Sequence, residues 1–361
     1  MNKNYLLFFY FIVINSFAQY TSIPDPNFEK ALILLGYDNV EDGRVRTYDI
    51  ADINYIELNG YEIESLKGIE GFRDLEILNV VDNKLKELDL SKNYKLKTLD
   101  CSENEISFLD LSANTKLTQV FCKENEMYKL NVTKNILLTD LDCSYNRMDT
   151  IDVTNNKKLL NLYIGDNEGI MELDVTNLTL LKELHASSNA LQELDLSNNP
   201  RLKNLIADNN KLKNLDLSHN PVLENIYLYD NQLYEFNMKN GNNTNIVDFE
   251  LEGNENLFCV QVDDPSYSRE NWIVIDPQTK YSLEACSKIS DDNTTAEFYK
   301  KGVRSDVTVA EFLYVEDPTK IEYKLKKASS EKYFKKGNIG ELQFLRVPTN
   351  NYFLEIKYLE D

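Results

Sequence analysis

Three cysteines, Cys101, Cys122 and Cys143, stand 21 residues apart, and thiols brought together could bind a metal ion or pair as a disulfide. On neighbouring parallel strands, the three sulfurs would stack about 4.8 Å apart. Side chains that point the same way match disulfide geometry poorly, and a buried cysteine otherwise behaves as a small, inert hydrophobe. The spacing therefore favours buried structural thiols, with metal binding or a disulfide as the alternatives.

The two remaining cysteines, Cys259 and Cys286, lie 27 residues apart and outside that spacing. In an exported protein such a pair favours a disulfide, which would stabilise the fold by about 3 to 4 kcal/mol in the chain-entropy model. The two histidines, His185 and His219, have no histidine or cysteine partner at the spacing of a zinc site. The sequence also has no glycine-rich phosphate loop and no Gly-x-Ser-x-Gly motif.

One acidic segment imitates a calcium-binding loop, with Asp38, Asp42, Gly43 and Asp49 at the first, fifth, sixth and twelfth positions. Val40 occupies the third position, where calcium requires an oxygen ligand, so a turn before a strand explains the segment better. We therefore predict no catalytic residue, no metal site and no cofactor.

A sequence repeat from Leu75 to Leu251 predicts the secondary structure that carries these residues. Its consensus is L-x-x-L-x-L-x-x-N-x-L-x-x-L-D-L-S-x-N-x-x. With a looser first unit from Ile53, it predicts about ten coils over residues 53–257. Each unit is too short to bury its own apolar residues, so the units must stack into one core. The alternation Leu99-Asp100-Cys101 predicts a short parallel strand in each coil, and hence a mainly β solenoid. The first asparagine of each unit falls at Asn83, Asn104, Asn125, Asn146, Asn167, Asn189, Asn210, Asn231 and Asn254.

Strand alternation also predicts which side chains face inward and outward. The position three residues before each asparagine is always apolar, and it includes the three cysteines, as expected of core residues. The positions four and two residues before each asparagine should face outward. Acidic residues lie near both ends of this outward row, and an aromatic and apolar stripe lies between them. The stripe could anchor a binding partner or could form ladder pairs without a ligand. Its members are Phe121, Tyr163, His185, Ile206, Tyr227 and Tyr229.

The chain start resembles an export signal, and we predict a signal peptide over residues 1–18. Lys3 gives the positive start, Leu6 to Ile14 form the apolar run, and Ser16-Phe17-Ala18 provides a small-x-small cleavage site. An uncleaved anchor is the alternative, but the run is too short to span a bilayer easily. The mature chain is thus predicted to leave the cytoplasm without direct membrane insertion. Its net charge of −21, from 39 basic and 60 acidic residues, argues against nucleic-acid binding and polybasic membrane attachment.

Both ends of the repeat array require caps. An N-terminal cap over residues 19–52 should contain a short amphipathic helix, and a C-terminal cap should cover residues 258–290. Residues 291–361 lack the repeat, and the stretches "KIEYKL", "GELQFLRV" and "NYFLEIKYL" predict strands of a small β-sandwich-like domain. The apolar residues of the predicted helix, at helical spacing, are Phe28, Ala31, Leu32 and Leu35.

The phrases "LKTLDCSENEISFLDLSAN" and "LKNLDLSHN" resemble the 21-residue leucine-rich repeats of the bacterial class called IRREKO. The flank "TSIPDPNFEKALILLGYDN" resembles the entry cap of exported leucine-rich repeat proteins from Gram-negative bacteria with type IX secretion. The tail around Tyr352-Phe353-Leu354-Glu355-Ile356 resembles the C-terminal sorting domain of that system. The usual Tyr-Pro-Asn-Pro entry is absent and Asn350-Asn351 replaces Ser-Gly, so a plain β-domain is the alternative. The resemblance implies exposure on the cell surface or release into the medium.

Two functional hypotheses remain from the sequence. In the first, a non-enzymatic, exported recognition protein binds a protein or glycan on the concave β-face of its solenoid. In the second, the array is a structural spacer of the envelope or matrix without a discrete ligand site. An enzyme with its site in the tail is disfavoured, because residues 291–361 contain neither histidine nor cysteine and are too few for a deep pocket.

Overall fold

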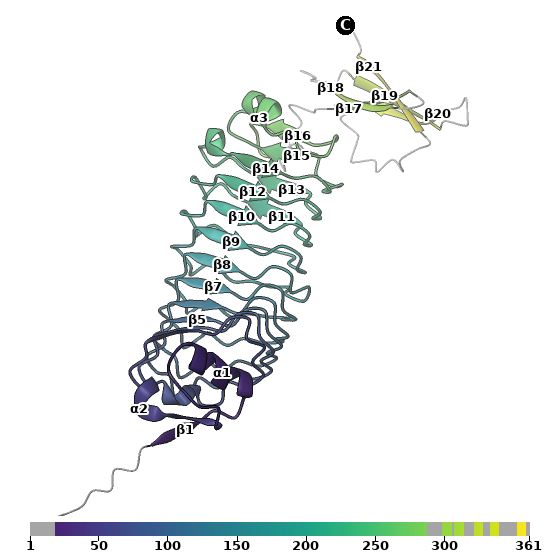
Figure 1. Ribbon diagram of the computed structural model, residues 1–361. Coiled ribbons are helices and arrows are strands. Elements are labelled where there is room, and N and C mark those ends of the chain that lie inside the picture. Colours follow the sequence, from purple (N-terminus) through teal and green to yellow (C-terminus); the bar gives the residue numbers. More distant parts are fainter. Residues whose placement is uncertain are drawn as a thin grey trace, which may run out of the picture. The chain divides into compact units, whose positions relative to one another are not determined.

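The computed structural model describes residues 19–286 with their side chains, together with the backbone of five strands between residues 298 and 358 (Figure 1). The chain divides into two compact units, residues 1–210 and 211–361, and each unit is described here by itself. The predicted signal peptide, residues 1–18, and the stretch "GELQFLRV" lie outside the described residues.

The first unit contains a parallel sheet of three-residue strands, one strand per coil. Each strand pairs with the next in a register that places equivalent repeat positions opposite one another, as Leu99 and Val120 are. The middle residue of each strand is buried while its two neighbours face outward, which is the alternation that a strand imposes. The strands, which follow one another in chain order in Figure 1, are β3 Tyr55–Glu57, β4 Ile77–Asn79, β5 Thr98–Asp100, β6 Gln119–Phe121, β7 Asp140–Asp142, β8 Asn161–Tyr163, β9 Glu183–His185 and β10 Asn204–Ile206.

The second unit continues the same architecture with two parallel sheets. In one, β12 (Asn225–Tyr227) pairs with β14 (Asp248–Glu250). The other has the order β11-β13-β15-β16. Its strands are β11 Asn214–Asp216, β13 Glu235–Asn237, β15 Cys259–Gln261 and β16 Lys280–Ser282. The predicted mainly β solenoid is therefore confirmed, with about 11 turns counted over the chain where about ten were predicted. The side of the coil opposite the first sheet carries the strands of this second sheet, whereas among the described residues of the first unit it carries an isolated bridge, between Asp110 and Asn131.

Buried asparagines hold each bend that follows a strand. The Nδ2 group of Asn104 donates to the backbone oxygens of Val80, Cys101 and Ser102, and its Oδ1 accepts from the Leu85 amide, all at 2.9 to 3.2 Å. The side chain thus joins two coils and forms hydrogen bonds with backbone groups that are not paired within the short strand. The residue before the asparagine has a positive φ in nearly every coil, for example 57° at Glu103, which makes the turn tight enough to bring the amide inward.

The N-terminal cap is built around a helix and a strand pair. Helix α1 (Pro26–Leu34) buries Phe28, Ala31 and Leu32, as the spacing predicts, and β1 (Tyr20–Ser22) pairs antiparallel with β2 (Arg44–Arg46). The expectation for Leu35 was wrong, because the helix ends one residue earlier and this side chain is exposed. A further short helix, α2, spans Thr47–Ile50, and η1, a 3-10 turn, spans Ile69–Gly71.

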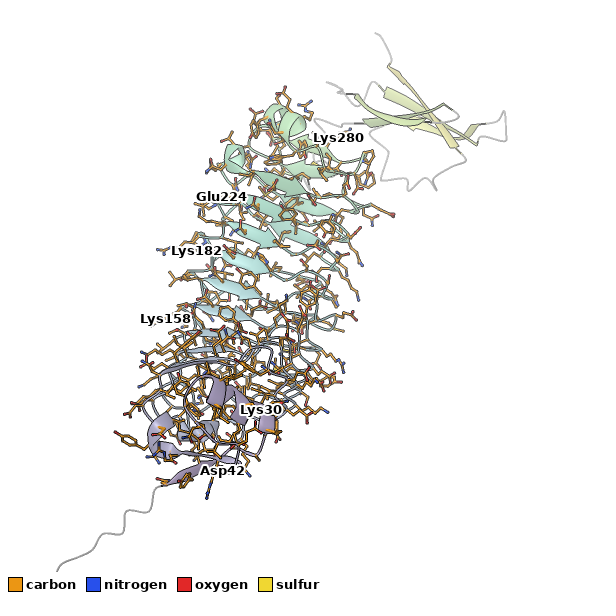
Figure 2. The ribbon with its side chains drawn as sticks, in the orientation of Figure 1. Lys30, Asp42, Lys158, Lys182, Glu224 and Lys280 are labelled. Atoms are coloured by element: carbon orange, nitrogen blue, oxygen red, sulfur yellow. A yellow bond between two sulfur atoms is a disulfide. The ribbon has the colours of Figure 1, made fainter. Side chains whose placement is uncertain are left out.

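Two buried carboxylates organise this cap. Asp25 caps α1 by accepting from the amides of Asn27 and Phe28, while its other oxygen accepts from the amides of Glu64 and Ser65 in the first coil. Glu29 Oε1 accepts from three successive amides, at residues 42, 43 and 44, within the segment that imitates a calcium loop. These amides point toward an anion, which is the opposite polarity to a cation site. Figure 2 shows Asp42 and Lys30 on this cap.

The C-terminal cap closes the second unit with aromatic stacking and a disulfide. Helix α3 (Pro265–Asn271) leads to Trp272, whose ring stacks on Phe249 at 4.5 Å between centroids and whose backbone oxygen accepts from the Tyr281 hydroxyl. The predicted disulfide between Cys259 and Cys286 is confirmed, with 5.8 Å between the Cα atoms. A 3-10 turn, η2 (Asn243–Asn245), precedes β14.

The tail strands are antiparallel, unlike those of the repeats. β17 (Phe298–Arg304) pairs with β18 (Val307–Leu313), and β19 (Ile321–Lys327) lies between β20 (Tyr333–Asn338) and β21 (Tyr352–Tyr358). Within the residues that the structure describes, no helix has the length and apolar character needed to cross a membrane.

Candidate binding site on the strand face

The outward side chains of β5 to β10 form the surface that we call the strand face. Three positions per coil contribute: the first and third residues of the strand, and the residue two places after it. The first position holds Thr98, Gln119, Asp140, Asn161, Glu183 and Asn204; the third holds Asp100, Phe121, Asp142, Tyr163, His185 and Ile206; the position after the strand holds Ser102, Lys123, Ser144, Gly165, Ser187 and Asp208. All first- and third-position residues are half-buried, so they are fixed by their neighbours but remain accessible.

The structure brings four of the predicted stripe residues into one column. Tyr163 lies opposite His185, and His185 lies opposite Ile206, so these three are direct neighbours. Phe121 occupies the same column but is separated from Tyr163 by Asp142. The sequence thus located the column correctly, while the carboxylate between its aromatic rings breaks the apolar stripe.

Tyr163 is held by two contacts on the β9 side. Its hydroxyl donates to Glu183 Oε2 at 2.8 Å, and its ring meets the His185 ring edge to face with 4.5 Å between centroids. Burial, and then the bond to Glu183, raise the pKa of Tyr163 well above its usual value. Burial lowers the pKa of His185, while Glu183, whose Oε2 lies 4.0 Å from His185 Nε2, and the more distant Asp142 and Asp208 act in the opposite direction. The lowered pKa favours the neutral imidazole.

The first-position column forms a hydrogen-bonded ladder that the sequence reasoning missed. Thr98 Oγ1 donates to Gln119 Oε1 at 3.2 Å, and Gln119 Nε2 donates to Asp140 Oδ2 at 3.3 Å. Asn161 Nδ2 and Thr139 Oγ1 also donate to Asp140, at 2.6 and 2.7 Å. The signal that could have found this ladder is the recurrence of polar residues six places before each asparagine from Asn104 onward, at Thr98 and its equivalents.

The position after the strand is occupied mainly by small or locally bonded side chains. Ser144 Oγ donates to Asp142 Oδ1 at 2.6 Å, and Ser187 Oγ donates to Asp208 Oδ1 at 2.7 Å. Lys123 pairs with Glu124 at 3.0 Å and lies over the ring of Tyr145. The strand face thus carries five carboxylates, at residues 100, 140, 142, 183 and 208, against one lysine, and it is acidic at neutral pH.

The other two predicted stripe residues belong to the second unit. Tyr227 ends β12 and lies opposite Glu250 of β14, and Tyr229 is half-buried two residues later. Burial, followed by the charge and hydrogen bond of Asp248, raises the pKa of Tyr227.

The residues Cys101, Cys122 and Cys143, which we call the cysteine column, lie directly beneath the strand face. All three are fully buried and free. Burial is the main cause that raises their pKa values far above that of an exposed thiol, and Cys122 Sγ donates to the backbone oxygen of Asp142 at 3.4 Å. Within residues 19–286, no group of three or more histidine, cysteine, aspartate or glutamate side chains is arranged to hold a metal ion.

No protein-family model matches the chain, and no curated protein matches it. Among solved structures, the functional domain of InlJ from Listeria monocytogenes, which includes a cysteine ladder, is 26% identical with a TM-score of 0.52, over 73% of this chain and 70% of that one. Internalin C2 from Listeria monocytogenes is 20% identical with a TM-score of 0.48, over 69% and 99% of the two chains. A leucine-rich repeat protein of Leptospira interrogans is 17% identical with a TM-score of 0.43, over 65% and 73%. Together with the strand register and the asparagine bends, the likeness to the InlJ domain shows that the chain has the leucine-rich repeat fold.

Proposed function

We propose that this protein is a non-enzymatic recognition module that binds a protein or glycan through the strand face. The observation that carries the proposal is the column of Phe121, Tyr163, His185 and Ile206. These side chains are half-buried and held by neighbouring strands, so little conformational freedom is left to lose on binding. Rigid aromatic side chains on an accessible face are typical anchors of binding surfaces.

The likeness to the InlJ domain supports a functional role for the repeat array. That domain is described as the functional part of its protein, and it matches this chain over most of its length. In the second unit, Tyr227 and Tyr229 are proposed as binding residues of that unit.

We also propose that the protein acts outside the cytoplasm of a Gram-negative bacterium, either secreted or on the cell surface. The disulfide between Cys259 and Cys286 supports an oxidising compartment, and residues 1–18 have the composition of a signal peptide. Residues 291–361 would then act as a sorting domain for type IX secretion, a role that deletion of these residues tests by retaining the protein in the cell.

The function is tested by affinity capture from surface-protein extracts and on a glycan array. The strand-face variant combines Tyr163→Ser with Ile206→Ser, and the control variant is Phe108→Ser, which removes an aromatic side chain that is 70% exposed and lies outside the strand face. Far-UV circular dichroism verifies that all proteins are folded. We expect the wild type and the control to retain one partner that the strand-face variant loses at least tenfold.

Two results would contradict the proposal. Equal retention by the strand-face variant would show that the partner binds elsewhere. If neither extract nor array gives a partner for the wild type, the spacer hypothesis, which requires no ligand site, takes its place.

A further inference from the structure

The third-position column has a notch at its centre, formed by Phe121, Asp142 and Tyr163. The three residues lie on adjacent strands in direct register, so Asp142 has an aromatic ring on either side. The aspartate side chain is much shorter than phenylalanine or tyrosine, so its carboxylate forms the floor and the two rings form the walls. The two outer strands are separated by about 9 to 10 Å, twice the spacing of paired strands.

The carboxylate at the floor has capacity for another donor. Asp142 Oδ1 accepts from the Ser144 amide at 3.0 Å and from its hydroxyl at 2.6 Å, whereas no hydrogen bond to Oδ2 is found within residues 19–286. Asp140, two residues earlier on the same strand, differs because both of its oxygens are bonded to neighbouring side chains. Of these two carboxylates, Asp142 is therefore the one that can accept from a ligand.

The Tyr163 wall of the notch is held in place from outside it. Tyr163 is fixed on its far side by Glu183 and His185, so its contacts do not close the notch. Lys123 is the one cation of the strand face, and it is engaged with Glu124 and the Tyr145 ring instead of forming an ion pair with Asp142.

We propose that the notch binds a basic side chain, arginine in particular, presented by a protein partner. The inference rests on the proposed function and names the chemistry of its partner. A guanidinium group can donate to the available Oδ2 of Asp142 while its plane stacks on aromatic faces, which an ammonium group does less well. Stacking on both sides requires about 7 to 8 Å between the rings, so each ring has to lean inward by about 1 Å from strands that lie about 9 to 10 Å apart. The five carboxylates of the strand face against one lysine give the complementary charge.

The test uses N-acetyl-arginine amide as a probe and the full chain with ¹³C-labelled tyrosine rings. The Tyr163 signals are assigned with the Tyr163→Phe variant, and binding is followed by their chemical-shift change. N-acetyl-citrulline amide has nearly the same shape without the charge and serves as the matched ligand. We expect a saturable shift with the arginine probe and at least tenfold weaker binding of the citrulline probe.

Two aspartate variants complete the test. Asp142→Asn preserves the acceptor for Ser144 and should weaken binding of the arginine probe at least tenfold. Asp152→Asn alters an exposed carboxylate outside the strand face, whose Oδ1 accepts from Thr154, and should leave binding unchanged. The inference is overturned if the citrulline probe, the lysine counterpart or maltose shifts Tyr163 with equal affinity, or if Asp142→Asn binds as tightly as the wild type.

The outcomes separate this inference from the proposed function. Loss of a captured partner on the strand-face variant, together with an arginine probe that does not bind the notch, would leave recognition intact and refute the arginine site. A notch that binds arginine on a protein that captures no partner would support the site and refute the recognition role.

Discussion

Replacing Asn125 by alanine is expected to lower the free energy of unfolding by about 2 to 4 kcal/mol. Its Nδ2 group donates to the backbone oxygens of Cys101, Cys122 and Lys123, and its Oδ1 accepts from the Ile106 amide at 2.9 Å. Each of the three carbonyls retains a second donor in the variant, whereas the Ile106 amide loses its side-chain acceptor. One buried amide without a partner costs about 1 to 3 kcal/mol, and the shared bonds account for the rest.

Asn125→Asp is a sharper perturbation because it has the same shape. The new carboxylate still accepts from the Ile106 amide, but its second oxygen meets carbonyl oxygens in place of donating to them. Burial and these carbonyls would raise the pKa of the new carboxyl group above its unfolded value of about 3.9. The destabilisation therefore grows as the pH rises from about 4 through the folded-state pKa, since only the protonated form donates.

Equilibrium urea unfolding, followed by far-UV circular dichroism at pH 4.5 and pH 7, measures both variants. The matched control is Asn131→Asp, an exposed position where the side chain only accepts from the amide and hydroxyl of Thr133 and where aspartate can do the same. We expect the control to stay within about 0.5 kcal/mol of the wild type. The reasoning is refuted if Asn125→Asp is as stable as the wild type at pH 7, or if its loss of stability does not increase between the two pH values.

Three further outcomes follow from the caps and the core. Asp25→Ala should destabilise the protein by about 2 to 4 kcal/mol in urea, because four backbone amides lose their acceptor, while the exposed Glu41→Ala should change little. The cysteine column should resist iodoacetamide at pH 8 in the native protein and react fully in urea, because burial raises the pKa values of its thiols. Labelling is detected by mass, and rapid labelling of the native protein would contradict the burial of these thiols. Replacing Cys259 and Cys286 together by serine should lower the free energy of unfolding by about 3 to 4 kcal/mol, and an unchanged urea midpoint would show that the bridge does not constrain the unfolded chain.

The coil geometry could be predicted from the sequence because it follows from two simple periods. The alternation around Leu99 and Cys101 fixes which side chains face inward, and the 21-residue repeat fixes the register between strands. A shift of one residue in the strand pairing would expose a row of apolar side chains, so alternative registers are strongly disfavoured. The same logic placed Tyr163 and His185 side by side, as the structure has them.

Contacts that depend on one particular pair of distant residues could not be predicted in this way. Asp25 accepts a hydrogen bond from the Ser65 amide, 40 residues away, and Glu29 accepts from amides 13 to 15 residues away. No local sequence pattern predicts these hydrogen bonds. The acidic residues around Asp42 have the spacing of a calcium loop. Such spacing does not specify whether backbone amides or backbone carbonyls point inward. Leu35 fits the helical period, but a period does not specify the residue at which the helix ends.

Asp140 and Asp142 show how the repeat separates stability from recognition. Both lie on β7, both face outward and both are half-buried, so composition and exposure do not distinguish them. The first-position carboxylate is bonded by three neighbouring side chains, and its removal would take an acceptor from Gln119 and Asn161, while Thr139 would keep the Thr118 carbonyl. The third-position carboxylate is bonded only within its own turn, so its identity can change without disturbing adjacent coils. On β7 the third position can therefore change its chemistry with less disturbance to adjacent coils than the first position, and the notch lies there.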